Sequence, residues 1–202
     1  MTSDRTALLH ELEAFGTAND SRVDAQSSKM LNITPDTGQF LAMLVRLRRP
    51  ARILEVGTSN GYSTIWLADA ASACGAVVET IERDPGKIEL ARDNFCRAGV
   101  ADVITQIEGE ASTVLATTAD ETYEFIFLDS KRTEYAAWWP DLRRILRPGG
   151  LVVCDNATSH PQEFVEFNEI VARTPEMATV LVPIGKGELL IQDQRAIEQV
   201  TP

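Results

Sequence analysis

The stretch ARILEVGTSNGYSTIWLADAA, residues 51–71, joins a short apolar run to a glycine-bearing turn and then to a run with helical spacing. The apolar run at 51–56 predicts a strand, and residues 62–71 predict a helix. The turn between them presents free backbone N–H groups at the start of that helix, and such groups bind anionic parts of ligands. The stretch therefore predicts a β–α unit with a ligand-binding turn.

The alternation of apolar runs and helical patterns continues along the chain. Further strands are predicted at 76–81, 102–108, 123–129 and 151–155. Further helices are predicted at 85–99, 110–117, 134–146 and 161–174. Residues 178–192 predict two strands around the turn PIGKG, and a direct turn joins antiparallel strands. The sequence thus predicts an α/β fold, Rossmann-like and doubly wound, with a mostly parallel sheet and a C-terminal antiparallel hairpin.

The N-terminal part of the chain has a different pattern. Two helices are predicted at 4–15 and 36–48, and between them lies the polar, turn-rich segment GTANDSRVDAQSSKMLNITPDTG. We expect residues 1–50 to supply N-terminal helices and a lid or substrate loop. Residues 51–202 are expected to form the main domain, and both parts belong to one globular unit.

The composition excludes several classes of function. With a net charge of −11 the surface repels nucleic-acid phosphates, so a small molecule is the expected partner. The two histidines exclude a multi-histidine metal site, and the three widely spaced cysteines favour neither a disulfide framework nor a cysteine zinc site. The N-terminus is charged, unlike a signal peptide, and no apolar run reaches the about 18 residues that span a membrane. We therefore expect a cytoplasmic protein without a membrane partner.

Carboxylates gather where the predicted parallel strands end. Ligands bind at this edge of open α/β sheets, because the carboxyl ends of the strands meet there. The residues at these ends are Glu55-Val56-Gly57, Glu82, Gly109, Asp129 and Asp155-Asn156. Carboxylates avoid burial unless they are paired or bind a metal. This clustering is the strongest indication of a functional site in the sequence.

The first turn does not match the common nucleotide-binding motifs. The dinucleotide fingerprint requires glycine where Ser59 and Tyr62 stand, and the Gly-Lys-Ser/Thr of a P-loop is absent. The turn does fit G-x-S-x-G, the nucleophile elbow of α/β-hydrolases, so Ser59 and His160 with a rim aspartate form an alternative catalytic triad. Against this alternative, the turn follows the first strand of the alternating pattern, and no earlier strand supplies an oxyanion loop.

Two groups of rim residues indicate particular ligands. Glu82 ends the second strand, where α/β nucleotide sites bind a ribose diol. Asp129, Asp155 and Asn156 offer only oxygen atoms, which suit Mg²⁺, Mn²⁺ or Ca²⁺ rather than zinc. The alternative for Asp155 and Asn156 is a turn or a helix cap.

Four motifs stand in order along the chain, namely LEVGTSNGYSTIWLA, IERDPGKIELARDNF, FIFLDSKRTEY and LRPGGLVVCDN. They resemble the motifs of the class I S-adenosylmethionine-dependent O-methyltransferases, and more closely those of the cation-dependent catechol and caffeoyl-CoA type. The upstream KMLNITPDTGQFLAMLVRL also resembles that family, so the resemblance covers residues 29–192. It implies the methyltransferase fold, S-adenosylmethionine as the cofactor, a divalent cation and a homodimer.

The resemblance implies a role for each matching residue. The methionyl end of the cofactor is expected to contact Ile33, Glu55, Gly57, Thr58, Ser63 and Asp129. The ribose and the adenine are expected beside Glu82 and Ala111, respectively. The divalent cation is expected to bind Asp129, Asp155 and Asn156.

The implied reaction is in-line methyl transfer, with the cation lowering the pKa of the acceptor hydroxyl. The family has an acid two residues after the first metal ligand and a lysine, the proposed base, three residues after it. This chain has Lys131 and Arg132 there, and arginine cannot release its proton at usable pH. Three interpretations stay open: Lys131 is the base, the cation suffices alone, or Arg132 binds an anionic group of the substrate.

We expect an S-adenosylmethionine-dependent O-methyltransferase that methylates a hydroxyl of a small molecule, such as a catechol, with the help of a divalent cation. The alternatives are a methyltransferase for a hydroxylated tRNA base, an esterase that uses Ser59, and a cofactor-binding protein that lost catalysis through the change to Arg132. The negative net charge weighs against a tRNA substrate.

Overall fold

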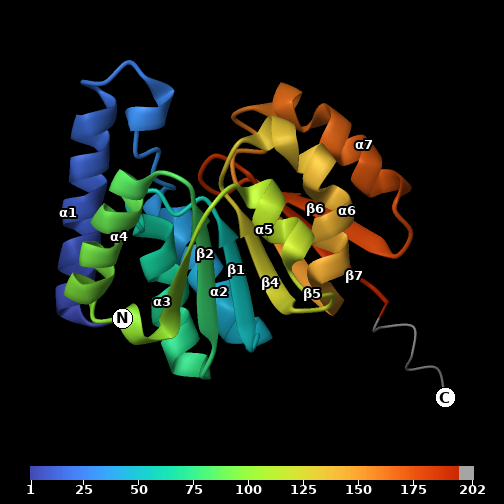
Figure 1. Cartoon of the computed structure of the whole chain (residues 1–202), viewed down its shortest axis with the longest axis horizontal. Coiled ribbons are helices and arrows are strands. Elements are labelled where there is room, and N and C mark those ends of the chain that lie inside the picture. The colour runs from blue at the N-terminus through green and yellow to red at the C-terminus, as the bar shows by residue number, and fades with distance from the viewer. Residues whose placement is uncertain (196–202) are drawn as a thin grey trace.

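Seven strands form one sheet in the order β3-β2-β1-β4-β5-β7-β6 in the computed structural model, which describes residues 1–195 (Figure 1). The strands are β1 Arg52–Val56, β2 Val77–Glu82, β3 Ile104–Glu108, β4 Tyr123–Leu128, β5 Leu146–Cys154, β6 Met177–Val182 and β7 Glu188–Asp193. Strands β1 to β5 pair in parallel, and β7 is antiparallel to β5 and β6. The predicted doubly wound sheet and its C-terminal hairpin are confirmed. Residues 196–202, the end of the predicted domain 51–202, lie outside the described residues.

Helices cover both faces of this sheet. They are α1 Ser3–Asp20, α2 Pro35–Arg48, α3 Tyr62–Cys74, α4 Pro85–Ala98, α5 Ala111–Thr117, α6 Tyr135–Ile145 and α7 Val165–Arg173. Short 3-10 helices occur at Gln26–Ser28, Ala101–Val103, Arg132–Glu134 and Pro161–Phe164. Figure 1 shows α1, α3 and α4 on one side of the sheet and α5, α6 and α7 on the other. None of the helices within residues 1–195 is long and apolar enough to cross a membrane.

Local signals in the sequence start and stop these helices. The side chain of Thr34 caps α2, and that of Asp84 caps α4 by accepting hydrogen bonds from two backbone N–H groups. Each of these helices has a proline in its first turn. Proline costs no hydrogen bond there, because an N–H group at that position has no partner within the helix. Gly75 and Gly99 end α3 and α4 in the left-handed conformation that glycine adopts without strain.

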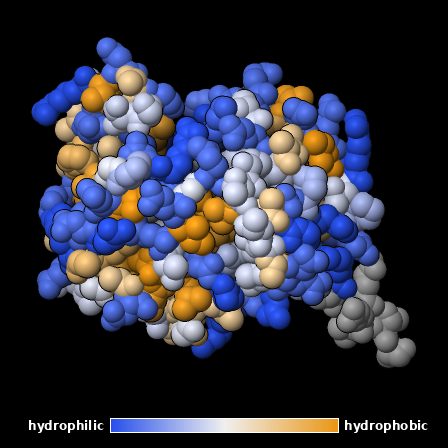
Figure 2. Space-filling view, in the orientation of Figure 1, coloured by the Kyte–Doolittle hydropathy of each residue, from blue (hydrophilic) through white to orange (hydrophobic). Residues whose placement is uncertain are grey.

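The strands divide their side chains between two hydrophobic cores, because successive side chains point to opposite faces. Ile53 and Phe125 pack with helices α1 to α4. Their neighbours Leu54 and Ile126 pack with helices α5 to α7. Outside these cores, the face of the molecule seen in Figure 2 is mostly hydrophilic, with a smaller apolar region near its middle.

Several predicted boundaries differ from the structure, and three of the differences have a clear physical reason. The strand predicted at 151–155 begins at Leu146, because Leu146 already pairs with Tyr123 of β4, and a register shift separates this pair from the pair of Leu151 with Phe125. The helix predicted at 161–174 is a 3-10 helix followed by α7. The helix predicted at 4–15 continues to Asp20 through Gly16, whose missing side chain leaves room for Asn32, so tertiary packing overrides the low helix propensity of glycine.

One buried carboxylate attaches α1 to the rest of the fold. Asp69 on α3 is 5% exposed and pairs with Arg5 of α1 and with Arg46 of α2, the latter at 2.5 Å. A buried charge that loses its partners is strongly destabilising. This ion network therefore fixes the position of α1 against α2 and α3.

Replacing Asp69 by alanine leaves Arg5 and Arg46 without their carboxylate partner. We expect Asp69→Ala to lower the free energy of unfolding by about 3 kcal/mol, the usual scale for a broken buried pair. The matched control Glu169→Ala removes only an exposed pair with Arg173 and should change stability by less than about 0.5 kcal/mol. Urea unfolding measures both variants, and equal losses would contradict the importance of the Asp69 network.

Candidate active site

Two neighbouring cavities, which share lining residues, open at the carboxyl edge of the sheet. The larger has a volume of about 480 Å³ and the smaller a volume of about 80 Å³. Both are lined by Gly57, Glu82, Arg83, Ser130 and Lys131, which follow or end β1, β2 and β4. The strand order reverses between β1 and β4, which is where doubly wound sheets bind their ligands.

The cavities bring together most of the residues that the sequence predicted for the site. One or both are lined by Ile33, Gly57, Thr58, Ser63, Glu82, Ala111, Asp129, Lys131, Arg132 and Asn156. The two predicted residues that line neither cavity are Glu55 and Asp155.

Backbone hydrogen bonds align the residues of this edge. The N–H of Asp129 donates to the carbonyl of Val56 at 3.0 Å, and the N–H of Asp155 donates to the carbonyl of Leu128 at 3.1 Å. Each bond continues the ladder between neighbouring parallel strands by one residue past its end. The predicted convergence of rim residues is therefore a consequence of strand register.

Gly57 allows the first turn to pass close to the end of β4. Its φ is +105°, and an added Cβ would lie 2.1 Å from the carbonyl oxygen of Asp129. The hydroxyl of the next residue, Thr58, is hydrogen-bonded to Thr80 at 2.6 Å. The following helix α3 has Gly61 at its N-cap, and the N–H of Tyr62 donates to Asn60 Oδ1 at 3.2 Å. The next N–H groups of its first turn are suited to an anionic ligand.

Glu55 lies behind this turn. It is fully buried, and its carboxylate accepts hydrogen bonds from the hydroxyls of Ser63 at 2.6 Å, Thr80 at 2.7 Å and Thr64. Burial raises the pKa of Glu55 to about 7, although the three hydroxyls act in the opposite direction. Because Ser63 lines the larger cavity, Glu55 fixes the position of a lining residue. A direct contact between Glu55 and a cofactor stays a prediction.

The carboxylate of Glu82 is oriented by three backbone groups. It accepts hydrogen bonds from the N–H groups of Ser59 and Arg83, both at 2.9 Å, and of Asp84 at 3.0 Å. Glu82 also lines both cavities. A carboxylate held in this way is ready to accept hydrogen bonds from a ribose diol.

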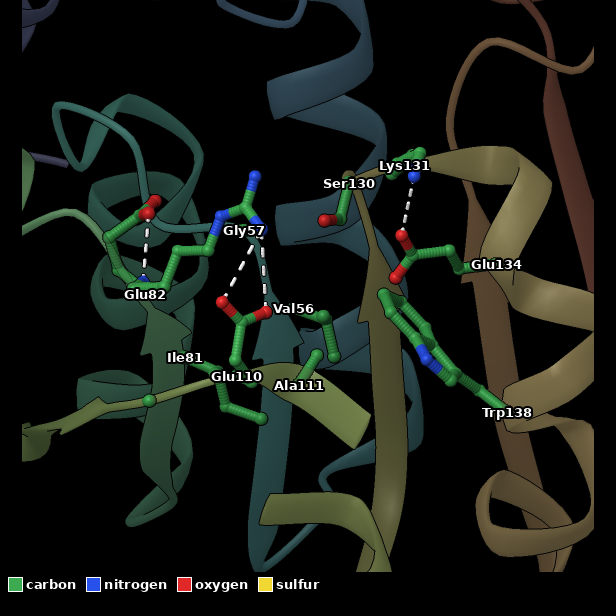
Figure 3. A pocket seen from close by; sticks show the side chains of 12 residues that line it. Val56, Gly57, Ile81, Glu82, Glu110, Ala111, Ser130, Lys131, Glu134 and Trp138 are labelled. Atoms are coloured by element: carbon green, nitrogen blue, oxygen red, sulfur yellow. Dashed lines mark hydrogen bonds and ion pairs between the residues drawn. The ribbon is translucent and has the colours of Figure 1, made fainter. Parts of the chain in front are cut away.

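The smaller cavity combines apolar walls with charged residues at its rim (Figure 3). Its apolar lining comes from Val56, Ile81, Ala111 and Trp138. Two ion pairs flank it, Arg83 with Glu110 at 3.4 Å and Lys131 with Glu134 at 2.7 Å. A pocket that combines apolar walls with charged and polar groups can accept a planar heterocyclic ring. Ala111, which the sequence resemblance places beside adenine, lies in this pocket.

Buried oxygen atoms gather where β4, β5 and β7 meet. Asp129 and Asn156 line the larger cavity, and next to them Asp155 and Glu188 are 2% and 0% exposed. The amide Nδ2 of Asn156 donates to Asp155 Oδ2 at 2.9 Å, and Thr37 donates to Glu188 Oε1 at 3.0 Å. Within residues 1–195, Asp155 Oδ1 and Glu188 Oε2 have no hydrogen-bond partner.

The carboxylates of this group repel one another. Burial, followed by the charges of Asp155 and Glu55, raises the pKa of Asp129 well above its usual range. The cations Lys186 and Arg132 act in the opposite direction on the same carboxyl. A cation placed among these oxygens therefore relieves a repulsion that the fold itself creates.

The donor set fits a hard divalent cation. Asp129, Asp155 and Asn156 supply carboxylate and amide oxygens, and Asp155 Oδ1 is buried without a partner in the described chain. In residues 1–195 no group of three or more His, Cys, Asp and Glu side chains is arranged to hold a metal ion. The predicted site thus depends on the amide oxygen of Asn156 as its third ligand.

The two cations that follow β4 have different surroundings. Lys131 is exposed, and its ammonium donates to Glu134 at 2.7 Å. Arg132 is largely buried, with Nε donating to Glu163 at 2.7 Å and Nη1 donating to Asn156 Oδ1 at 2.9 Å. The guanidinium is therefore bound to one of the predicted metal ligands.

Residues 26–33 form one wall of the larger cavity. The hydroxyl of Ser59 donates to the carbonyl of Met30 at 2.8 Å. The ammonium of Lys87 donates to the carbonyl of Lys29 at 2.9 Å. Asp20 at the end of α1 accepts a hydrogen bond from the N–H of Met30 at 2.7 Å. The turn after β1, helix α4 and helix α1 thus hold this segment over the cavity.

The alternative catalytic triad is not assembled. The hydroxyl of Ser59 donates to the backbone of the N-terminal segment. The ring of His160 bonds to Ser159 at 2.9 Å, its one side-chain partner among the described residues. Ser59 therefore lacks the base that an esterase mechanism needs.

Sequence reasoning missed three residues that border the oxygen group, Thr37, Lys186 and Glu188. Glu188 stands at the start of the apolar run LLI, and the start of an antiparallel strand lies at the edge where the parallel strands end, so the predicted hairpin could have indicated it. Thr37 and Lys186 carry no such signal, because a helix N-terminus and a hairpin turn are ordinary places for these residue types.

The buried carboxyl of Glu55 predicts a pH dependence of stability. Its pKa is about 7 in the folded protein against an ordinary value of 4.5, so between these values the folded state binds more protons than the unfolded state. The stabilisation from this group is complete at pH values below the ordinary pKa and is lost as pH rises through the folded pKa. Between pH 5 and 7 the loss is about 2 kcal/mol.

Urea unfolding of the cofactor-free protein at several pH values tests this prediction. Glu55→Gln removes this titrating group and should make this part of the profile less steep. The control Glu89→Gln changes an exposed glutamate on α4 and should keep the slope of the unsubstituted protein. A Glu55→Gln profile with an unchanged slope would show that the carboxyl titrates normally.

Comparison with known proteins agrees with this geometry. The model of the O-methyltransferase family matches residues 2–194 of the chain. A catechol O-methyltransferase of Niastella koreensis is 33% identical over 195 residues, covering 89% of this chain and 87% of that protein. A catechol O-methyltransferase of Mycobacterium tuberculosis is 37% identical over 133 residues, covering 66% of this chain. The chain spans 60% of the length of that second relative.

Solved structures agree as well. An O-methyltransferase of Bacillus cereus in complex with S-adenosylhomocysteine has a TM-score of 0.79 and 26% identity, covering 93% of this chain and 90% of that chain. TomG of Streptomyces achromogenes in complex with S-adenosylmethionine has a TM-score of 0.75 and 26% identity, covering 96% and 90%. Fold, cavity position and sequence family lead to one conclusion. The chain belongs to the O-methyltransferase family of S-adenosylmethionine-dependent enzymes.

Proposed function

We propose that this enzyme methylates a hydroxyl of a small molecule with two neighbouring oxygen atoms, such as a catechol, and that a divalent cation assists. The observation that carries the proposal is the larger cavity, which connects Gly57 and Glu82 to the oxygens of Asp129 and Asn156. A cofactor bound at Gly57 and Glu82 would therefore lie next to an acceptor molecule bound at Asp129 and Asn156. Two relatives named catechol O-methyltransferase support this class of acceptor.

In this proposal the cofactor extends along the carboxyl edge of the sheet. The adenine occupies the smaller cavity beside Ala111, and the ribose diol binds the carboxylate of Glu82. The methionyl end lies against the turn at residues 57–63, with Ile33 and Asp129 on its other side. The start of α3 and the three backbone contacts that orient Glu82 support this placement.

Asp129, Asp155 and Asn156 would hold the divalent cation, which is Mg²⁺, Mn²⁺ or Ca²⁺ by their oxygen chemistry. The unpartnered Oδ1 of Asp155 and the raised pKa of Asp129 support this assignment. When bound, such a cation lowers the pKa of a coordinated hydroxyl, so that an oxyanion exists near neutral pH. The chain itself contributes position, by holding the acceptor oxygen in line with the sulfonium methyl.

Neither cation after β4 has the surroundings of a general base. Arg132 keeps its proton at any usable pH. Lys131 is exposed, and its ammonium donates to Glu134 instead of to a predicted ligand of the cation. In the proposal these two residues act as fixed charges near the acceptor, and proton release from the hydroxyl depends on the divalent cation.

We also propose that residues 1–50 act as a lid over the domain that begins at residue 51, in a cytoplasmic homodimer. The lid is supported by residues 26–33, which line the cavity. The dimer is supported by family resemblance and by Met43 and Leu47 of α2, which are 58% and 74% exposed. The three free cysteines fit a reducing compartment.

Methyl transfer from S-adenosylmethionine to catechol tests the proposed function. We expect product in the presence of Mg²⁺ and a rate loss of about a hundredfold with EDTA, because a bound cation supplies several kcal/mol of stabilisation. Asp155→Asn should give a similar loss while the protein still binds S-adenosylhomocysteine.

The outcomes separate the parts of this proposal. Turnover that EDTA leaves unchanged would remove the divalent cation from the mechanism. Cofactor binding without methylation of catechols would remove this acceptor class and favour a cofactor-binding protein without catalysis.

A further inference from the structure

The guanidinium of Arg132 occupies an oxygen that the proposed divalent cation requires. We propose that Arg132 is an internal competitor of that cation. Its Nη1 holds Asn156 Oδ1 at 2.9 Å, and a divalent ion completes its ligand set only after this contact breaks. The inference rests on the proposed function, because it takes Asp129, Asp155 and Asn156 as the ligands.

The amide of Asn156 is fixed with its oxygen toward Arg132. Its Nδ2 donates to Asp155 Oδ2 at 2.9 Å, so turning the amide over would place two oxygen acceptors against each other. The backbone of Asn156 is also constrained, with a φ of +71° in the left-handed region. A metal ion at the one side-chain oxygen of Asn156 would therefore share that atom with the positively charged guanidinium.

Arg132 is itself anchored in this position. Its Nε donates to Glu163 Oε2 at 2.7 Å, and its side chain is 16% exposed. A guanidinium and a divalent cation at the same oxygen repel each other, and little water lies between them to screen the repulsion. Because Glu163 continues to hold Nε, the guanidinium that leaves Asn156 stays beside the site.

The contact also places a positive charge beside the cluster of acids. Asp129 and Asp155 are drawn together by strand register, and the guanidinium of Arg132 lies against the neighbouring Asn156. Arg132 thus supplies a positive charge at the place proposed for the divalent ion. The consequence is a cation site that is occupied only at high concentrations of the divalent ion.

Binding of Mn²⁺, followed by electron paramagnetic resonance of the free ion, tests the inference without an activity measurement. The protein is saturated with S-adenosylhomocysteine, which also shows that each variant is folded. We expect Arg132→Met to bind Mn²⁺ about tenfold more tightly, because one unit charge near the ion is removed. Arg132→Gln is a second neutral variant with the same expectation, in case the methionine variant does not fold.

Lys131→Met is the matched control. It removes the same charge from the adjacent residue, whose ammonium contacts Glu134 instead of a predicted ligand. Its dissociation constant for Mn²⁺ should stay within about twofold of the unsubstituted protein, since exposed charges are screened.

Each result has a distinct meaning. Tighter binding only in the Arg132 variants supports the competitor. Equal or weaker binding in these variants, or the same gain in Lys131→Met, overturns it and leaves the cation site standing. Absence of Mn²⁺ binding in every variant, with S-adenosylhomocysteine bound, overturns both the competitor and the proposed cation, but not the methyltransferase assignment.

Discussion

The register of three parallel strands is the constraint on which the site depends. Because β1, β4 and β5 end level with one another, the residues that follow them meet at a single edge. The bonds from Asp129 to Val56 and from Asp155 to Leu128 extend that alignment by one residue into the site. A shift of one residue in either strand pair would turn a carboxylate away from the cavity. The pairing of the strand backbones thus determines which residues meet at the site.

This alignment concentrates negative charge, and each carboxylate is stabilised in a different way. Glu55 is surrounded by hydroxyls, and Glu82 is bound by backbone N–H groups. Asp155 depends on the amide of Asn156, and one of its oxygens is left without a partner in the described chain. The first two environments suit a neutral or positioned group, and in the proposed function the third would hold a cation. The different surroundings of these acids would then separate cofactor binding from acceptor activation.

The fold and the rim of the site were predictable because they follow from local patterns. Apolar runs ending in acids marked the strand ends, and glycines and prolines marked the helix boundaries. The surroundings of Arg132 were not predictable, since its contacts with Asn156 and Glu163 depend on the path of the loop after β5. Lys186 was also out of reach, because a turn residue reaches the site only through the antiparallel docking of β7 on β5. Long-range contacts of single side chains were the part that sequence patterns could not supply.

In the proposed function the carboxyl edge of the sheet binds the cofactor, and Glu82 is the acid on the ribose. The most direct measurement is calorimetric titration with S-adenosylhomocysteine of the unsubstituted protein and of Glu82→Gln. We predict saturable binding to the unsubstituted protein and an affinity at least about tenfold weaker in the variant, because a hydrogen bond to a charged group contributes about 1.5–3 kcal/mol. No binding at millimolar ligand, or equal affinity in both proteins, would contradict this account of the site.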